Sequence, residues 1–351
     1  MGERARQGAL YLALAVVALG LEFGLRPLVG DSSLRQLIMT AAVNVLIALS
    51  LNIINGMAGQ FSIGHAGFVG VGAYTAAVLM ANLHERMPGD ITFARSFLFV
   101  PVSVGSAAVL AAVCGLTVGL PSLRLRGDYL AIVTLGFSEI FRLLIATASA
   151  GDAGLLARLG GQNGYAGPHD QGVPQYSGPF WVFGAVFVVF VLCRRLKFSG
   201  WGRALRALRE DEVAAAAVGV DPTRYKVTSF VLAAAGAGLA GGLLATMHDG
   251  APATQPDQFG FQASFDAITM VILGGSGSVS GAALGALFVT FTIKLFEFLQ
   301  STPTMQALRE SQPWLDLNAL RMVIYATTLI AVMIVRPEGV LGEREIGEAK
   351  R

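Results

Sequence analysis

The sequence predicts an all-α fold, a polytopic transmembrane helical bundle, and three observations indicate this class. Hydrophobic residues make up 54% of the 351 residues, and charged residues only 14%, whereas soluble domains carry about 25% charged residues. The mean hydropathy is +0.62. Long apolar runs reach the ~20 residues that a helix needs to cross the hydrocarbon layer. We therefore treat residues 1–351 as one transmembrane domain.

Ten apolar segments are predicted to be membrane segments. They cover residues 9–25, 34–54, 61–83, 96–120, 128–149, 179–196, 226–248, 262–276, 281–299 and 319–336. The segment 61–83 is interrupted by glycines and the segment 262–276 is short, so both are expected to be broken or re-entrant helices. An even number of segments places both ends of the chain on the same side.

The distribution of Lys and Arg predicts an orientation with both termini inside. Under that arrangement the inside segments hold sixteen Lys and Arg residues and the outside segments eight. Half of the inside charges fall in residues 194–226. The sequence thus predicts a cytoplasmic loop at residues 197–222 and a polar, Gly- and Pro-rich external loop at residues 151–178, which is a connector or a docking surface.

The cytoplasmic loop is predicted to contain a helix over residues 203–218. Leu205 and Leu208 share one face of that helix, and Gly219 provides a C-terminal stop. Asp221 followed by Pro222 predicts the N-cap and first turn of the next helix. The run "AAAAVG" leaves a small-residue face that suits a groove in another protein, although a solvated loop that obeys the charge rule is the simpler interpretation.

Sequence signals for a cofactor are missing. No G-x-x-x-x-G-K-[ST] phosphate loop is present, and no metal-ligand spacing occurs. Cys114 and Cys193 both fall in or at the end of apolar runs, away from any His or Cys cluster. The net charge of +2 gives no indication of nucleic-acid binding. A chain of this kind that drives uphill transport must receive its energy from elsewhere.

Two glycine-rich segments, one in each half, are candidates for a transport pathway. The residues expected to line or shape it are Ser62, Gly64, His65, Tyr74, Gly274, Gly275 and Gly277. Close helix packing is the preferred interpretation of the glycines spaced by four, which are Gly238, Gly242, Gly277, Gly281 and Gly285. For His65 the simpler alternative is a hydrogen bond to a neighbouring helix.

Two pairs of opposite charge, three residues apart, lie in apolar segments: Glu139 with Arg142, and Lys294 with Glu297. Intramembrane ionisable residues often have functional roles, but pairs near helix ends equally well serve packing. No isolated acid with His or Asn neighbours lies in the middle of a segment, which disfavours a proton-coupled carrier.

Six stretches together resemble the LivM-like permease subunits of branched-chain amino acid ABC importers, in family order over residues 44–342. They are "LNIINGMAGQFSIGHAGFVGVGAYTAA", "LPSLRLRGDYLAIVTLGFSEIFR", "LGGQNG", "GRALRALREDEVAAAAVGVDPTRYKVTSFVLAAAGAGLAGGLLA", "MVILGGSGSVSGAALGALF" and "VRPEGVLG". The resemblance implies that the loop 197–222 holds a coupling helix that docks on an ATPase. The coupling residues would be Arg203, Arg206, Arg209, Glu212, Ala214, Ala215 and Gly219. The family pattern E-A-A-x-x-x-G is met except that Val213 occupies the acid position and Glu212 lies one residue earlier.

The resemblance also implies partners and a location. Expected partners are a second homologous permease, two cytoplasmic ATP-binding subunits that hold ATP and Mg²⁺, a periplasmic or lipid-anchored substrate-binding protein, and membrane lipid, in the bacterial cytoplasmic membrane. Branched-chain and other hydrophobic amino acids are the expected substrates, with urea or short-chain amides as the alternative of a sister branch. A stand-alone ion-coupled secondary transporter is the alternative from another class; a membrane enzyme lacks a nucleophile or metal constellation.

Overall fold

The computed structural model describes residues 29–123, 129–148, 159–167, 172–250, 253–302, 339–342 and 344–345, and the single residues 20, 22, 323, 327, 330 and 334. Within these parts of the chain the secondary structure is helical, and the only β-type pairings are two isolated bridges, Tyr165 with Thr254 and Ser177 with Met247. The predicted all-α class is confirmed.

Seven of the described helices are long and apolar enough to cross a membrane. They are α2 (Ser32–Asn52, continued by the π-helical turn η1, Ile53–Met57), α3 (His65–Arg86), α4 (Phe93–Ser122), α5 (Tyr129–Thr147), α6 (Pro179–Phe198), α9 (Pro222–Thr246) and α11 (Val279–Ser301). The shorter elements are η3 (Gly161–Asn163), α7 (Gly200–Glu210), α8 (Glu212–Ala217), η5 (Pro256–Phe259) and α10 (Phe261–Gly274).

These seven helices coincide with seven of the ten predicted segments. Apart from isolated residues, the predicted segments 9–25 and 319–336 lie outside the described residues. The number of ten segments and the orientation therefore stay predictions. The segment 262–276 forms α10, which at 14 residues is too short for a full crossing.

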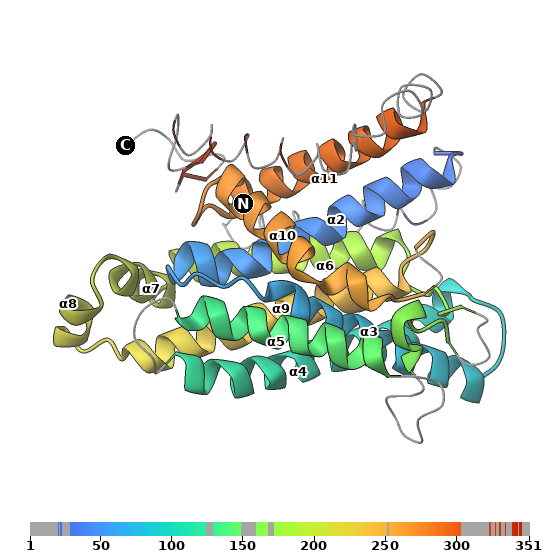
Figure 1. Cartoon of the computed structure of the whole chain (residues 1–351), viewed down its shortest axis with the longest axis horizontal. Helices are drawn as coiled ribbons and strands as arrows, with labels where there is room; N and C mark the ends of the chain where they lie inside the picture. The colour runs from blue at the N-terminus through green and yellow to red at the C-terminus, as the bar shows by residue number, and fades with distance from the viewer. Residues whose placement is uncertain are drawn as a thin grey trace, which may run out of the picture.

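Helix α9 occupies the centre of the bundle and packs against α2, α3 and α4. Helices α10 and α11 pack on each other and on α2. The short helices α7 and α8 protrude at one end of the bundle, where α6 ends and α9 begins (Figure 1). The molecule thus has one end marked by two short helices and an opposite end where α2 begins and α9 ends.

Glycines let the central helices approach to backbone contact. A Cβ atom at Gly72 would lie 2.2 Å from the Gly238 carbonyl oxygen, and one at Gly241 would lie 1.9 Å from the Val69 carbonyl oxygen. Between α10 and α11, a Cβ atom at Gly285 would lie 2.0 Å from the Met270 carbonyl oxygen. These helices can approach so closely only where no side chain intervenes.

The predicted packing role of the spaced glycines is confirmed for Gly238, Gly281 and Gly285, each of which would bring a Cβ within 3 Å of a neighbouring backbone atom. At Gly242 a Cβ would meet two alanine methyl groups at 3.2 Å, a milder restriction. Gly277 differs, because it lies in the turn between α10 and α11 with a φ of +93°. Left-handed backbone of this kind favours glycine.

The expected break in the segment 61–83 was wrong. Helix α3 begins at His65 and continues to Arg86, with Gly67, Gly70 and Gly72 inside it. Glycine weakens helices in water, but in an apolar surrounding the backbone groups have no other partner, so the helix persists. The irregular backbone lies just before it, at residues 58–64.

Gly241→Ala is expected to lower the thermal unfolding midpoint of the detergent-solubilised protein, because the added methyl group collides with the Val69 carbonyl; overpacking of this kind costs about 1–3 kcal/mol. Gly105→Ala in α4 is the matched control, since its Cβ would have no neighbour within 4 Å. Size-exclusion chromatography after heating measures both midpoints. Equal midpoints for the two variants would contradict the close approach of α3 and α9.

Candidate functional site

The predicted helix 203–218 is two helices, which corrects the sequence prediction. Helix α7 ends at Glu210, and α8 starts at Glu212. Asp211 between them is extended (φ −154°, ψ 110°), and its carboxylate accepts hydrogen bonds from the backbone N–H groups of Val213 and Ala214 at 2.8 and 3.0 Å. The physical reason is that an aspartate makes a strong N-cap, so the chain starts a new helix there.

Helix α7 is fixed to the bundle by its apolar face. Leu205 and Leu208 are buried, as the predicted shared face requires. The Trp201 ring lies 5.8 Å from the Tyr225 ring at the start of α9. Ser199 caps α7 by accepting from the Gly202 N–H at 3.3 Å. A displacement of α7 would therefore also displace α6 and α9.

Helix α8 and the residue after it present apolar side chains to the solvent. Val213 and Val218 are 80% and 79% exposed, whereas Ala215 is buried. Gly219 ends the helix with a φ of +90°, and Asp221 caps α9 by accepting from the Arg224 N–H at 3.2 Å. The predicted stop and restart at these two residues are confirmed. Exposed valines on a charged loop leave an apolar patch that none of the described residues covers.

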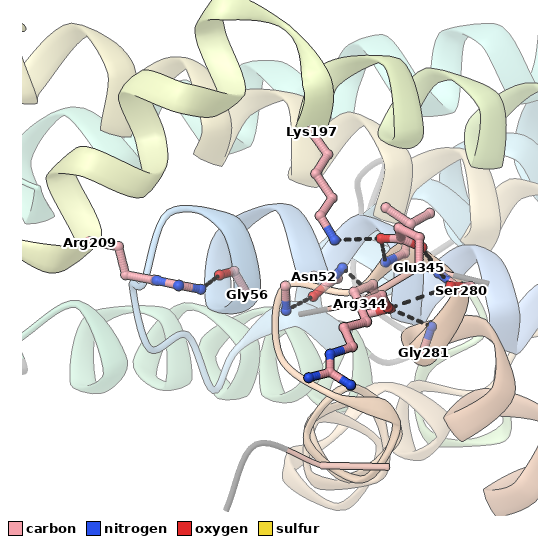
Figure 2. A network of polar contacts seen from close by, with 11 residues as sticks. Asn52, Gly56, Lys197, Arg209, Ser280, Gly281, Arg344 and Glu345 are labelled. Carbon is pink, nitrogen blue, oxygen red and sulfur yellow. Dashed lines mark hydrogen bonds and ion pairs between the residues drawn. The ribbon is translucent and has the colours of Figure 1, made fainter. Parts of the chain in front are cut away.

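The predicted coupling residues divide into outward and inward groups. Arg203 is exposed, and Ala214 and Gly219 are exposed on or after α8. Glu212 is bound to Lys226 at 2.6 Å. Arg206 is half-buried, and Arg209 points into the bundle, where its Nη1 donates to the Gly56 carbonyl oxygen at 2.9 Å (Figure 2).

Asn52 holds the turn between α10 and α11 against α2. Its Oδ1 accepts from the Gly277 N–H at 2.9 Å, and its Nδ2 donates to the Ser278 carbonyl oxygen at 3.1 Å. Asn52 is fully buried and lies four residues before Gly56. The end of α2 thus binds α7 through one carbonyl group and the glycine-rich turn through one side chain.

Glu345 closes the same region from the C-terminal part of the chain. Its Oε1 lies 2.6 Å from Lys197 Nζ at the end of α6 and accepts from the Val279 N–H at 2.8 Å. Its Oε2 accepts from the Ser280 N–H at 2.9 Å and from the Ser280 hydroxyl at 2.5 Å (Figure 2). The carboxylate therefore sits at the N-terminus of α11, where the helix dipole favours negative charge.

The backbone beside Glu345 strengthens this attachment. Ser278 Oγ donates to the Arg344 carbonyl oxygen at 2.7 Å. The N–H groups of Val340 and Leu341 donate to the carbonyl oxygens of Leu273 and Gly274 at the end of α10. We define the Glu345 network as these contacts of residues 339–342, Arg344 and Glu345 together with Lys197 and the Asn52 bonds. Sequence reasoning missed it, because Glu345 lies in a charged tail that looks solvated; the one hint was a lysine, Lys197, ending an apolar helix.

The predicted pathway residues of the first half are buried between helices. His65 Nε2 lies 2.8 Å from Ser50 Oγ of α2. The simpler alternative for His65, a hydrogen bond to a neighbouring helix, is therefore observed. Ser62 is completely buried and Tyr74 is 4% exposed. A Cβ at Gly64 would meet the Thr134 carbonyl oxygen at 1.7 Å. These four residues pack α3 against its neighbours.

The predicted glycines of the second half form the α10–α11 turn itself. Gly274 ends α10, and Gly275 and Gly277 have φ values of +119° and +93°. They are the residues that the Glu345 network holds. Their position links the pathway prediction to the coupling prediction.

Two adjoining cavities lie elsewhere, between α2, α3, α9, α10 and α11. Their volumes are about 380 and 120 Å³. Both are lined by Asn44, Leu244, Gln258, Phe259 and Ile293. The larger one also has Gln36, Thr40, Thr290 and Lys294 in its wall. Sequence reasoning missed these polar residues, although Gln36, Thr40 and Asn44 recur every four positions within an apolar segment.

The charge pair on α5 stabilises packing. Arg142 Nε lies 2.9 Å from Glu139, and its Nη1 lies 3.0 Å from Asp257 of η5. Glu139 Oε1 also accepts from the Phe261 N–H at the start of α10, at 3.0 Å. For the second pair, Lys294 lines the larger cavity, and the side chain of Glu297 lies outside the described residues. Among the residues that the structure describes, no three His, Cys, Asp or Glu side chains cluster as metal ligands do.

A family model described as the permease component of a branched-chain amino acid transport system matches residues 33–333. The chain belongs to this family. The high-affinity branched-chain amino acid transport system permease protein LivM of Salmonella typhimurium is 31% identical over 97% of this chain and 76% of its own length, and LivM of Escherichia coli gives the same values. LivH of Escherichia coli is 26% identical over 86% of this chain and 92% of its own length. No solved structure gives a significant match.

The LivM-like resemblance read from the sequence is thus confirmed. The family and the seven apolar helices identify a multi-pass membrane protein. In this permease the exposed α8, the inward Arg209 and the Glu345 network lie at one end of the bundle. That arrangement can carry a displacement from the short helices to α2 and to the α10–α11 turn.

Glu345 makes the stability of the permease depend on acid pH. Burial alone would raise the pKa of its carboxyl group, but the hydrogen bonds from Lys197, Ser280 and Val279 outweigh burial and lower the pKa below its ordinary value of 4.5. A lowered folded-state pKa stabilises the fold at pH values above 4.5, and this contribution disappears as the pH falls through the folded-state pKa.

Glu345→Gln is therefore expected to lower the unfolding midpoint at pH 7, because Lys197 loses its buried partner, at a cost of about 3–5 kcal/mol. The midpoint should also fall less steeply than that of the wild type when the pH drops from 6 towards 3. Thermal unfolding across this pH range measures both effects. If the unfolding midpoints of the two proteins fell equally between pH 6 and pH 3, the role given to the carboxylate would be refuted.

Proposed function

We propose that this chain is the transmembrane permease subunit of an ABC importer that moves branched-chain amino acids into the cytoplasm, driven by ATP hydrolysis on partner subunits. Family membership supports the class of transporter, and LivM relatives carry the substrate class in their names. The observation that carries the proposal is the exposure of Val213 and Val218 on α8 and directly after it. Helices α7 and α8 protrude from one end of the bundle (Figure 1). An apolar surface exposed in this way serves to bind another protein.

The end that carries α7 and α8 faces the cytoplasm in this proposal. Residues 194–226 hold eight Lys and Arg residues, which is the charge excess of an inner loop. Both termini then lie inside, the loop 151–178 lies outside, and the protein resides in the bacterial cytoplasmic membrane. The family supports this location.

The partner on α8 is a cytoplasmic ATP-binding subunit, one of two in the complex, and it holds ATP and Mg²⁺. Val213 and Val218 would enter its apolar groove, while Arg203 and Glu212 would meet polar groups at its rim, as protein interfaces are commonly arranged. Ala214 and Gly219 have no bulky side chain, so they would not obstruct this contact. Ala215 serves a different purpose, because it packs inward.

Movement of the docked α8 reaches the membrane helices through α7. Arg209 connects α7 to the Gly56 carbonyl of η1, and Asn52 connects the end of α2 to Gly277 and Ser278. Contiguous hydrogen-bonded elements of this kind can carry coupling between distant sites. The glycine-rich segments, with Ser62, Gly64, His65 and Tyr74 in one and Gly274, Gly275 and Gly277 in the other, shape the pathway by setting how closely α3 and α10 approach their neighbours.

The remaining partners are a second homologous permease, for which LivH provides a related example, and a periplasmic or lipid-anchored substrate-binding protein that supplies selectivity. The substrate passes through the pair of permeases. A urea or short-amide permease is disfavoured by the apolar side chains in the cavities, among them Leu244, Met247, Phe259 and Ile293.

Val213→Glu with Val218→Glu is expected to abolish leucine uptake and docking of the ATP-binding subunit, because two charges replace the apolar contact. The folded permease should still reach the membrane, since both side chains are about four-fifths exposed. Uptake into proteoliposomes and co-purification of the ATP-binding subunit are the measurements.

Thr223→Glu, at an exposed position in the first turn of α9, is the control and should keep uptake, because an acid is tolerated at a helix N-terminus. The permease reconstituted alone tests the rival class. Gradient-driven leucine uptake by the single chain, or normal ATP-driven uptake by the double variant, would overturn the proposal.

A further inference from the structure

One face of α2 is polar along the half that is remote from α7. Gln36, Thr40 and Asn44 are spaced by four residues, so they lie above one another on the helix, and all three line the larger cavity. Between Asn44 and Asn52 the only polar residue of α2 is Ser50, whose hydroxyl lies against His65. Polar side chains on one face of a membrane helix commonly mark a route for a polar solute.

The facing wall comes from α11. Thr290, Ile293 and Lys294 lie within five residues and line the same cavity. Asn44 Nδ2 donates to Thr290 Oγ1 at 2.8 Å, which joins the two walls. Beyond this bond the smaller cavity continues between α3 and α10, with Ala66, Ala263 and Asp266 in its lining.

The lining is amphipathic in a way that suits an aliphatic amino acid. The amide groups of Gln36 and Asn44 and the hydroxyl of Thr40 can both donate to a carboxylate and accept from an ammonium group. The Thr290 hydroxyl donates to the Ala286 carbonyl oxygen, so it can only accept from a bound solute. Lys294 and Asp266 add one charge of each sign near the two cavities. The aliphatic side chain of such an amino acid would face Leu244, Phe259 and Ile293. The combined volume of the two cavities is in the usual range for a small-ligand site.

The cavity lies towards the end of the bundle opposite α7 and α8. Met247 at the end of α9 and Thr254 after it line the larger part, and the lining of α2 stops at Ile47. Five residues further along α2, Asn52 begins the contacts that hold the α10–α11 turn. The space is therefore on the outer side of the Glu345 network in the proposed orientation.

We propose that these two cavities form an outward-facing transit site for an aliphatic amino acid. The Asn44–Thr290 pair lies where the two cavities join. This inference rests on the proposed importer function and adds a place where the permease itself contacts the substrate. The contacts are neutral polar groups for the most part, which bind weakly enough to release a solute that must move on.

The test compares two threonines of α11 in the complete reconstituted transporter. Thr290 lines the cavity, whereas Thr292 donates to the Phe288 carbonyl and lines neither cavity. Both make the same hydrogen bond to the carbonyl four residues earlier. Thr290→Val should reduce kcat/KM for leucine uptake about fivefold, the effect of one lost hydrogen bond, while Thr292→Val and the hydroxyl-retaining Thr290→Ser should stay near the wild type.

A volume change tests the smaller cavity. Ala263→Phe fills much of the space that Ala263 lines, so leucine transport should fall more than valine transport, with the same binding protein in both assays. Stimulation of ATP hydrolysis by the loaded binding protein should persist, because α7 and α8 are untouched. An unchanged leucine-to-valine ratio would count against the site.

Cysteine labelling gives a readout that does not require transport by the variant. In a chain with Cys114→Ala and Cys193→Ala, Thr40→Cys should react with a membrane-impermeant thiol reagent from the outside, and leucine-loaded binding protein should slow the reaction. Val109→Cys on α4, 65% exposed on the apolar outer surface, should not react.

The outcomes separate the two proposals. If the wild type imports leucine but Thr290→Val matches Thr292→Val and Thr40→Cys stays unlabelled, the transit site is wrong and the importer function stands. If the complete wild-type transporter fails to import leucine, the proposed function itself fails. If Thr290→Val does not reach the membrane, labelling of Thr40→Cys decides on its own.

Discussion

A single buried carboxylate, that of Glu345, holds together the end of the molecule that carries α7 and α8. Glu345 accepts hydrogen bonds from the first turn of α11 and pairs with Lys197 at the end of α6. Lys197 and Glu345 are 6% and 5% exposed. A buried ion pair adds little net stability compared with apolar packing, but it fixes geometry, since breaking it leaves an uncompensated charge. It therefore keeps the α10–α11 turn, the described residues 339–342, 344 and 345, and α6 in one arrangement.

Around this carboxylate the other contacts form a continuous path. The turn that Glu345 supports is bound to Asn52 of α2, and the carbonyl of Gly56 one helical turn later is bound to Arg209 of α7. Close packing by glycines extends the rigidity into the centre of the bundle, where α3 and α9 meet at backbone distance. The cavities lie on the far side of this path from α7 and α8. An input at the short helices can thus alter the space where a solute would pass.

The helical class and seven segments could be predicted from the sequence, because apolar length alone determines them. Gly219, Asp221 and Pro222 were also readable, since capping is a local property of the chain. The break at Asp211 was not predicted, because the helical spacing of the apolar residues continues on both sides of it and was weighted above the capping tendency of aspartate. The break expected at the glycines of α3 was wrong for a related reason, since their effect depends on the helix that packs against them.

The candidate site was predictable in part. The loop 197–222 could be identified from its charge and its resemblance to a family, but the inward direction of Arg209 depends on where η1 lies. Glu345 and Lys197 are 148 residues apart in the sequence, and nothing local indicates that they meet. The polar stripe of Gln36, Thr40 and Asn44 was visible as a period-four pattern, yet only the fold shows that a cavity lies beside it.

The most direct test of the coupling path is the number of ATP molecules hydrolysed per leucine imported by Arg209→Ala in the reconstituted transporter. Arg209 contacts Gly56 inside the permease, so the ATP-binding subunit should still dock and hydrolyse ATP when stimulated. Leucine import should fall while hydrolysis continues, so the ratio should rise severalfold over the wild type. An unchanged ratio with normal import would contradict the claim that this contact carries the movement of α7 to the membrane helices.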